Sequence, residues 1–185
     1  MYKTIIKPTL VLTIISVVIS ALLALTYNLT GLGNASTGIP QEELDVYGEV
    51  ALPGASLKAV KFESQFVVKD LTLLGVYADE NGNGFALHFS AKGYSKPDSI
   101  KMLVGYDANG AIAGIYPISS EETPNLGTMA LEPGYLANYI GVTGPVTIGE
   151  DLDAVAGATL TSKAMANAIS SSFEYYNEVK GGLAE

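Results

Sequence analysis

The sequence contains no cysteine and no arginine, and its only histidine is His88. The absence of cysteine excludes disulfides, cysteine-ligated iron–sulfur clusters, thiolate zinc sites and a cysteine nucleophile. A single histidine also excludes a histidine-rich metal site, and a lone histidine within a strand is usually a packing or surface residue. We therefore expect no metal centre in this chain.

Positive charge is scarce as well. The ten basic residues are all lysines, and with nineteen acidic residues they give a formal net charge of −9 at pH 7. This charge would repel a phosphate backbone, so nucleic-acid binding is disfavoured. Because there is no arginine, a phosphate group must be held mainly by backbone amides.

Several familiar enzyme motifs are also missing. The sequence has no Gly-x-Ser-x-Gly elbow, no Walker loop and no dinucleotide-binding fingerprint, so hydrolase, NTPase and Rossmann assignments lack support. Acidic pairs such as Asp151 and Asp153 lack the spacing of an EF-hand, and Glu121-Glu122 by itself is typical of a solvated loop.

One long apolar run lies near the N-terminus. Thr9–Tyr27 carries no charge over nineteen residues, and a helix of that length rises about 28 Å, close to the thickness of the hydrocarbon core of a bilayer. Lys3 and Lys7 precede it, so the positive-inside rule predicts a cytoplasmic N-terminus and an extracytoplasmic domain. The alternative is a cleaved signal peptide, but Leu22 occupies the first position of the small-x-small site that cleavage needs.

The rest of the chain predicts one domain. We expect a membrane anchor over residues 1–29, a linker rich in small residues over 30–40, and a domain over 41–185. Apolar periodicity and turn residues predict a short amphipathic helix over 41–52, strand pairs over 71–78 with 85–91 and over 100–107 with 111–118, and a final helix. Thr161 or Ser162 should cap that helix, and Gly181-Gly182 should end it. The predicted fold class is α+β, with a twisted antiparallel sheet and flanking helices at its ends or on one face.

The segment that leads into the final helix has the features of an anion site. Residues 156–158 are small and allow close backbone approach, Thr159 and Thr161 supply hydroxyl groups, and the free amides of a helix N-terminus follow. The alternative is that Thr161 and Ser162 only cap the helix. The residues alone leave both interpretations open.

Two motifs resemble those of the FMN-binding domain family. Residues 153–161, Asp-Ala-Val-Ala-Gly-Ala-Thr-Leu-Thr, are similar to the family's flavinylation motif Asp-x-x-Ser-Gly-Ala-Thr-x-Thr. Gly93-Tyr94, the turn at 107–110 and the Glu-Thr-Pro-Asn-Leu-Gly segment at 122–127 follow a second family signature. The order and the apolar N-terminal segment agree as well, so the resemblance covers essentially the whole chain. Members include the G subunit (RnfG) of the Rnf electron-transport complex, which the length favours, and the longer C subunit of the sodium-pumping NADH:quinone reductase.

The resemblance implies a covalent cofactor. In this family the last threonine of the flavinylation motif carries FMN through a phosphoester bond made by a dedicated flavin transferase, and that role falls on Thr161. Leu126 would contact the flavin ring, while Glu122 or a backbone amide would meet its polar edge. The remaining expected cofactor-binding residues are Gly157, Ala158, Thr159, Leu160, Ser162, Thr123 and Gly127.

The implied function is electron transfer within a membrane complex. The chain resembles a redox subunit of an ion-translocating, ferredoxin-linked oxidoreductase. The expected partners are the other subunits of the complex, the flavin transferase and membrane lipid. We expect the chain by itself to turn over no substrate. Two alternatives remain: an anchored sensor or binding domain of the same fold without flavin, and a surface or filament protein. The filament interpretation expects a glycine-ended leader and an early glutamate in the apolar helix, and both are missing.

Four departures from the family pattern concern the tuning of the flavin. Ala156 replaces a serine, Asn125 replaces a glycine, Ser120-Glu121 stand where many members have a histidine, and residues 95–97 replace a glycine-containing continuation. Asparagine also tolerates left-handed backbone, so the change at position 125 is mild.

Overall fold

The computed structural model divides the chain into two units, residues 1–36 and 37–185. It describes residues 12, 13, 15–20, 22 and 38–183, apart from 63, 66 and 95. The predicted anchor and linker lie mostly outside the described residues, although the described positions from 12 to 22 are helical. Among the residues described, no helix is long and apolar enough to cross a membrane. Membrane anchoring therefore stays a prediction, whereas the second unit can be described element by element.

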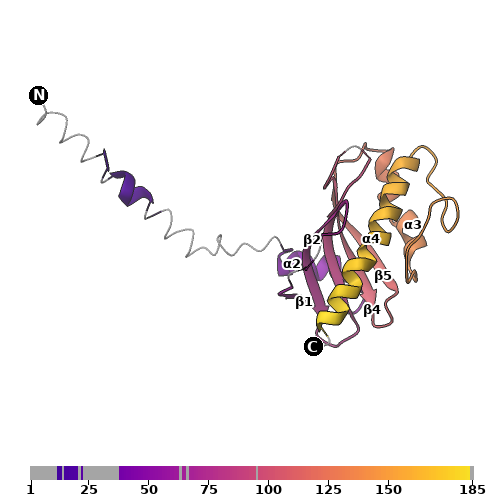
Figure 1. Ribbon diagram of the computed structural model, residues 1–185, viewed down its shortest axis with the longest axis horizontal. Coiled ribbons are helices and arrows are strands. Elements are labelled where there is room, and N and C mark those ends of the chain that lie inside the picture. Colours follow the sequence, from indigo (N-terminus) through magenta and orange to yellow (C-terminus); the bar gives the residue numbers. More distant parts are fainter. Residues whose placement is uncertain are drawn as a thin grey trace, which may run out of the picture. The chain divides into compact units, whose positions relative to one another are not determined.

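The second unit is built on an antiparallel sheet whose strands follow one another in chain order, as expected for an α+β fold (Figure 1). The strands are β1 (Leu57–Val60), β2 (Leu71–Asp79), β3 (Gly84–Ala91), β4 (Ile100–Asp107) and β5 (Ile112–Ser120). Both strand pairs predicted from turn residues are confirmed, whereas β1 carries no clear sequence signal.

Aspartates organise both predicted turns. Asp79 accepts a hydrogen bond from the backbone N–H of Asn83 at 3.0 Å, and Asp107 accepts the N–H groups of Asn109 and Ala111, each at 2.9 Å. An aspartate that bonds to backbone a few residues ahead fixes a turn without help from the rest of the fold. This local control explains why the sequence predicts both hairpins.

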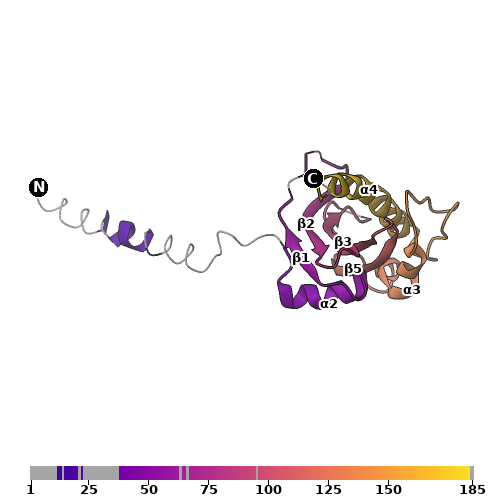
Figure 2. The same cartoon turned by 90° about the horizontal axis from the view of Figure 1, so that it is seen from below.

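Helices cover both faces of the sheet. The helix α2 (Gln41–Ala51) packs on the face that carries Ala86 and Leu103, and α4 (Thr159–Leu183) packs on the face that carries Leu87 and Val104. Figure 2 shows the two helices on opposite sides of the strands. The expected arrangement had helices at the ends or on one face. The difference follows from β3, whose residues from Phe85 to Ala91 are all buried and so need cover on both sides.

Two glycines let α2 approach the sheet closely. A Cβ on Gly105 would lie 2.0 Å from the carbonyl oxygen of Ala51, and a Cβ on Gly114 would lie 2.1 Å from that of Val50. No side chain fits at such distances, so the C-terminal end of α2 can rest on β4 and β5 only where these strands carry glycine.

Both ends of α4 differ from the sequence expectation. The helix begins at Thr159, so Thr161 and Ser162 lie inside its first turn and do not cap it. It also continues through Gly181-Gly182 to Leu183. A Cβ on Gly182 would lie 3.2 Å from the Phe62 ring, so the glycine provides a close contact instead of a helix stop. Tertiary packing outweighs the local propensity here.

Three short helical segments join β5 to α4. They are η2 (Gly127–Leu131), α3 (Pro133–Leu136) and η3 (Ala137–Tyr139). Their apolar residues, including Leu131, Leu136 and Tyr139, are buried in the same core as α4. Segments this short show no readable periodicity, so sequence analysis did not find them.

His88 is a packing residue in the centre of the sheet. It pairs with Gly75 on β2 and Leu103 on β4, and its side chain is only 6% exposed. Neither ring nitrogen has a hydrogen-bond partner among the described residues. Burial, assisted by the charge of Lys101, lowers the pKa of His88 to about 4.

Acid should destabilise the fold through His88. The pKa of His88 in the folded chain lies below the ordinary value of 6.5, which applies to the unfolded chain. Above pH 6.5 the imidazole is neutral in both states. As the pH falls from 6.5 toward 4, the unfolded chain takes up the proton more readily than the folded chain, so the free energy of unfolding decreases. When the pH is lowered from 7 to 4.5, the free energy of unfolding of the wild-type chain should fall by about 2 kcal/mol more than that of the His88→Leu variant. Urea unfolding at both pH values measures this difference, and equal losses in the two proteins would contradict it.

Candidate functional site

The two motifs singled out in the sequence meet at one cavity of about 370 Å³. One wall comes from the segment after β5, and the other comes from the start of α4 and the loop before it. The lining residues are Tyr94, Glu122, Thr123, Leu126, Gly127, Gly157, Ala158, Thr159, Leu160 and Thr161. Every expected cofactor-binding residue except Ser162 is among them.

The first wall is a compact turn that leads into η2. The carbonyl oxygen of Thr123 accepts the N–H groups of Leu126 and Thr128, both at 3.2 Å, and the Thr128 hydroxyl accepts the N–H of Asn125 at 3.0 Å. Asn125 has a φ of 57°, so asparagine adopts the left-handed backbone expected where the family pattern has glycine. The replacement keeps the shape of the turn.

The second wall is fixed by Ser162, which faces away from the cavity. Its hydroxyl accepts the N–H of Val155 at 3.1 Å, while Ala158 donates its N–H to the Val155 carbonyl at 2.9 Å. Gly157 has a φ of 82° and lies close to Leu126, whose Cδ1 would be 3.3 Å from a Cβ at this position. Ser162 therefore holds the loop in place and does not line the site.

Thr161 and Glu122 connect the two walls directly. The Thr161 hydroxyl donates a hydrogen bond of 2.7 Å to Oε2 of Glu122. Both side chains are buried, with exposed fractions of 3% for Thr161 and 7% for Glu122. The resemblance implies Glu122 or a backbone amide at the polar edge of a flavin, whereas the carboxylate in the structure accepts from the Thr161 hydroxyl.

The other oxygen of Glu122 is held by neutral donors. Oε1 accepts the backbone N–H of Tyr94 at 3.1 Å and the Ser99 hydroxyl at 3.4 Å. Ser99 in turn accepts the N–H of Gly93 at 2.9 Å. Sequence analysis missed Ser99, because a single serine before a strand carries no signal until the fold brings it beside the carboxylate.

Two glycines leave room for this carboxylate. A Cβ on Gly93 would lie 2.1 Å from Oε1 of Glu122, and a Cβ on Gly127 would lie 3.0 Å from both Oε2 of Glu122 and Oγ1 of Thr161. Side chains at either position would displace the carboxylate or the hydroxyl. The glycines of the second signature thus serve the Glu122–Thr161 contact.

The rim of the cavity is apolar and exposed. Tyr94, Leu126 and Leu160 have exposed fractions of 60%, 48% and 58%, and all three line the cavity. Thr159, the first residue of α4, is also exposed. The cavity thus has an apolar rim and a buried hydroxyl, that of Thr161.

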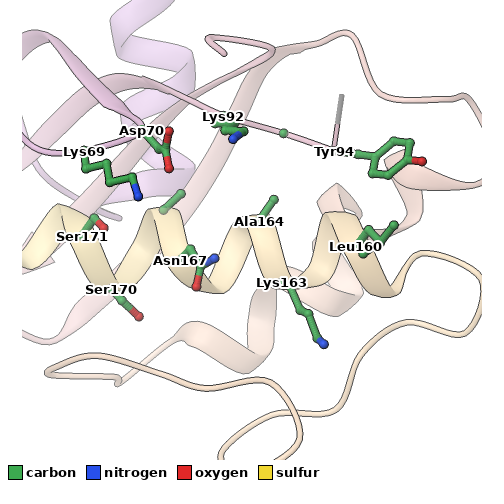
Figure 3. Close-up of a pocket in the computed structure, with 12 residues that line it drawn as sticks. Lys69, Asp70, Lys92, Tyr94, Leu160, Lys163, Ala164, Asn167, Ser170 and Ser171 are labelled. Atoms are coloured by element: carbon green, nitrogen blue, oxygen red, sulfur yellow. The ribbon is translucent and has the colours of Figure 1, made fainter. Parts of the chain in front are cut away.

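A second cavity of about 480 Å³ adjoins the first and shares Tyr94 and Leu160 with it. Its lining includes Lys69, Lys92 and Lys163 together with one carboxylate, Asp70, so positive charge exceeds negative charge here in an otherwise acidic chain. Figure 3 shows Lys92 and Tyr94 facing the helix that carries Leu160. This places a local positive potential next to the Thr161 cavity.

Asp151, weighed as a cation ligand, has a structural role. Asp151 accepts the N–H of Thr147 at 2.8 Å and closes a turn. Within the part of the chain that the structure describes, no three histidine or acidic side chains form a metal-binding group. Glu121 is exposed and pairs with Lys96.

Comparison with known proteins finds a family match for part of the domain. Residues 93–174 match the FMN-binding domain family, and this stretch contains both signatures and the Glu122–Thr161 contact. This part of the chain is therefore similar to that family.

Similarity to curated relatives extends further along the chain. The chain is 29% identical over 199 residues to the G subunit of the Na⁺-translocating ferredoxin:NAD⁺ oxidoreductase complex of Acetobacterium woodii, an alignment that covers 96% of this chain and 94% of that protein. It is 26% identical over 198 residues to the G subunit of the ion-translocating oxidoreductase complex of Methanosarcina acetivorans, with coverage of 97% and 98%. A protein with the same description from Shewanella piezotolerans is 28% identical over 137 residues, with coverage of 65% and 63%. The resemblance to RnfG found in the sequence is therefore confirmed.

Crowding at Gly127 should destabilise the domain. Gly127→Ala places a methyl group 3.0 Å from the two bonded oxygen atoms, and overpacking of this kind costs about 1–3 kcal/mol of unfolding free energy. The matched control is Gly134→Ala, where a Cβ meets no atom within 4 Å. Urea unfolding should separate the two variants, and equal stabilities would show that the site tolerates a side chain at position 127.

Proposed function

We propose that this chain is the FMN-carrying electron-transfer subunit of an ion-translocating oxidoreductase complex of the Rnf type. The observation that carries the proposal is the convergence of both family signatures on one cavity, with the Thr161 hydroxyl at its base. The family match and the two relatives aligned over nearly their full lengths support it. As in those relatives, the subunit would work as part of a complex, and it would turn over no substrate alone.

FMN would be held covalently through a phosphoester to Thr161, attached by a flavin transferase. The flavin supplies the redox chemistry, because it can accept and release one or two electrons. Leu126, Leu160 and Tyr94 provide an apolar surface for the ring, and their exposure leaves the ring edge open to neighbouring subunits. A tethered cofactor needs little noncovalent affinity, so a shallow cavity is sufficient.

The lysines beside the site favour a reduced flavin. Reduction adds negative charge to the ring, and Lys69, Lys92 and Lys163 line the adjoining cavity. Their charge also offsets the acidic character of the chain at the place where a phosphoester would sit.

The proposal includes a membrane anchor over residues 1–29, with the N-terminus in the cytoplasm and the flavin domain on the other side. It is supported by the uncharged run Thr9–Tyr27 and by Lys3 and Lys7 before it. Other subunits of the complex, membrane lipid and the flavin transferase would be its partners.

Flavin should attach to Thr161 and to no other residue. Coexpression with a flavin transferase should give a chain that carries one FMN, visible as in-gel fluorescence after denaturation and as one added mass in the intact protein. Thr161→Ala should abolish both signals, because no hydroxyl remains at the buried position beside Glu122.

Two matched variants serve as controls for this experiment. Thr161→Ser keeps the hydroxyl and should retain the adduct, and Thr159→Ala should retain it because Thr159 is exposed at the start of α4. FMN on a Thr161→Ala chain would disprove the assignment, and an unmodified wild-type chain would favour an anchored domain without flavin.

The domain should be digested by protease from outside the cytoplasm. In spheroplasts that express the full chain, added protease should remove residues after about 40 and leave a membrane-bound fragment. The double variant Lys3→Gln, Lys7→Gln lacks the positive side chains that favour a cytoplasmic N-terminus. Fewer chains should then place the domain outside the cytoplasm, so the digested fraction should decrease. Protection of the wild-type domain until the cells are lysed would contradict the orientation.

A further inference from the structure

We propose that Glu122 is the group that accepts the proton of Thr161 when the flavin is attached, so that the chain takes part in its own modification. This inference rests on the proposed function, because it assumes that Thr161 is the attachment site. It assigns a chemical role to a carboxylate that sequence analysis linked only to the flavin ring.

The geometry places a proton acceptor on the reacting oxygen. Oε2 of Glu122 lies 2.7 Å from Oγ1 of Thr161, within the range of about 2.6–3.2 Å that general base catalysis requires. A threonine hydroxyl is a weak nucleophile unless a neighbouring base takes its proton. Thr161 therefore has its base in place before any enzyme binds.

The surroundings keep the carboxylate aimed at Thr161. Oε1 is fixed by the Tyr94 N–H and the Ser99 hydroxyl, so Oε2 remains free to accept from Thr161. Gly93 and Gly127 leave the space that the carboxylate occupies. The carboxylate is therefore held with one oxygen on the reacting hydroxyl.

The reaction can be written with every atom placed. Oγ1 of Thr161 attacks the flavin-side phosphorus of a flavin dinucleotide, a phosphoanhydride, and a new phosphorus–oxygen bond forms. The anhydride bond to the second phosphate breaks, and the nucleotide leaves as a phosphate monoester. The proton from Thr161 moves to Oε2 of Glu122, and nothing is oxidised or reduced.

The product also benefits from this proton transfer. The phosphoester formed on Thr161 carries a negative charge, which an ionised Glu122 at hydrogen-bond distance would repel. Once protonated, Glu122 can donate a hydrogen bond to a phosphoester oxygen. The same group thus assists the reaction and removes the charge conflict that attachment creates.

Glu122 further explains the choice between the two threonines of the motif. Thr159 and Thr161 are two residues apart, but only Thr161 is buried against the carboxylate. Thr159 is exposed at the first position of α4. Attachment should follow the hydroxyl that has a base, even though the other is more accessible.

The test is the initial rate of flavinylation of the full-length chain by a purified transferase with a flavin dinucleotide as donor. In Glu122→Gln the amide oxygen can accept from the Tyr94 N–H and the Ser99 hydroxyl, and the NH2 group then faces Thr161 as a donor. The side chain keeps its size but can no longer take the Thr161 proton, and the rate should fall roughly 100-fold. Glu121→Gln makes the same change at the neighbouring carboxylate, which is exposed and paired with Lys96 outside the cavity, and should leave the rate unchanged. Thermal unfolding of each variant checks that it is folded.

A second variant separates a chemical role from a structural one. Glu122→Ala should be slow, and added formate should restore part of its rate by supplying a carboxylate in the vacated space. Formate should not accelerate the wild-type chain or Glu121→Gln. Structural damage would not be repaired by formate in this way.

The outcomes distinguish this inference from the proposed function. A folded Glu122→Gln chain that is modified on Thr161 at the wild-type rate would overturn the role of Glu122 and leave the attachment site intact. If Glu122→Gln does not fold, a Glu122→Ala chain that formate does not accelerate would overturn it as well. A wild-type chain that takes up no FMN, or takes it up elsewhere, would instead contradict the proposed function.

Discussion

The hydrogen bond from Thr161 to Glu122 is the contact on which the rest of the site depends. It joins the first turn of α4 to the segment after β5, and the two residues are 39 positions apart in sequence. Burying a carboxylate is costly unless hydrogen bonds replace the water it loses. Thr161, Ser99 and the N–H of Tyr94 supply those bonds, so folding itself brings the two signatures together.

The fold supports this contact from both faces of the sheet. The α4 side carries the large core that fixes the first turn of the helix, and α2 closes the opposite face through the glycine contacts at Gly105 and Gly114. The cavity opens at the end of α4 beside the exposed rim of Tyr94, Leu126 and Leu160. A rigid base beneath an open apolar rim suits a carrier whose cofactor must be held firmly and still meet other proteins.

The sequence predicts the parts of this architecture that local chemistry controls. The hairpins follow from turns closed by Asp79 and Asp107, and most of the cavity lining follows from the two motifs. Long-range packing decides the remainder. The cover of the sheet on both faces and the support from Ser99 depend on residues that are distant in sequence, and no local pattern reports them.

The most direct test of the account is peptide mapping of the chain isolated from the membranes of its native host. Digestion followed by fragmentation mass spectrometry locates any flavin without variants or coexpressed enzymes. The account predicts one FMN phosphoester on Thr161 and unmodified Thr159 in the same peptide. A chain without flavin, or with flavin on another residue, would contradict it.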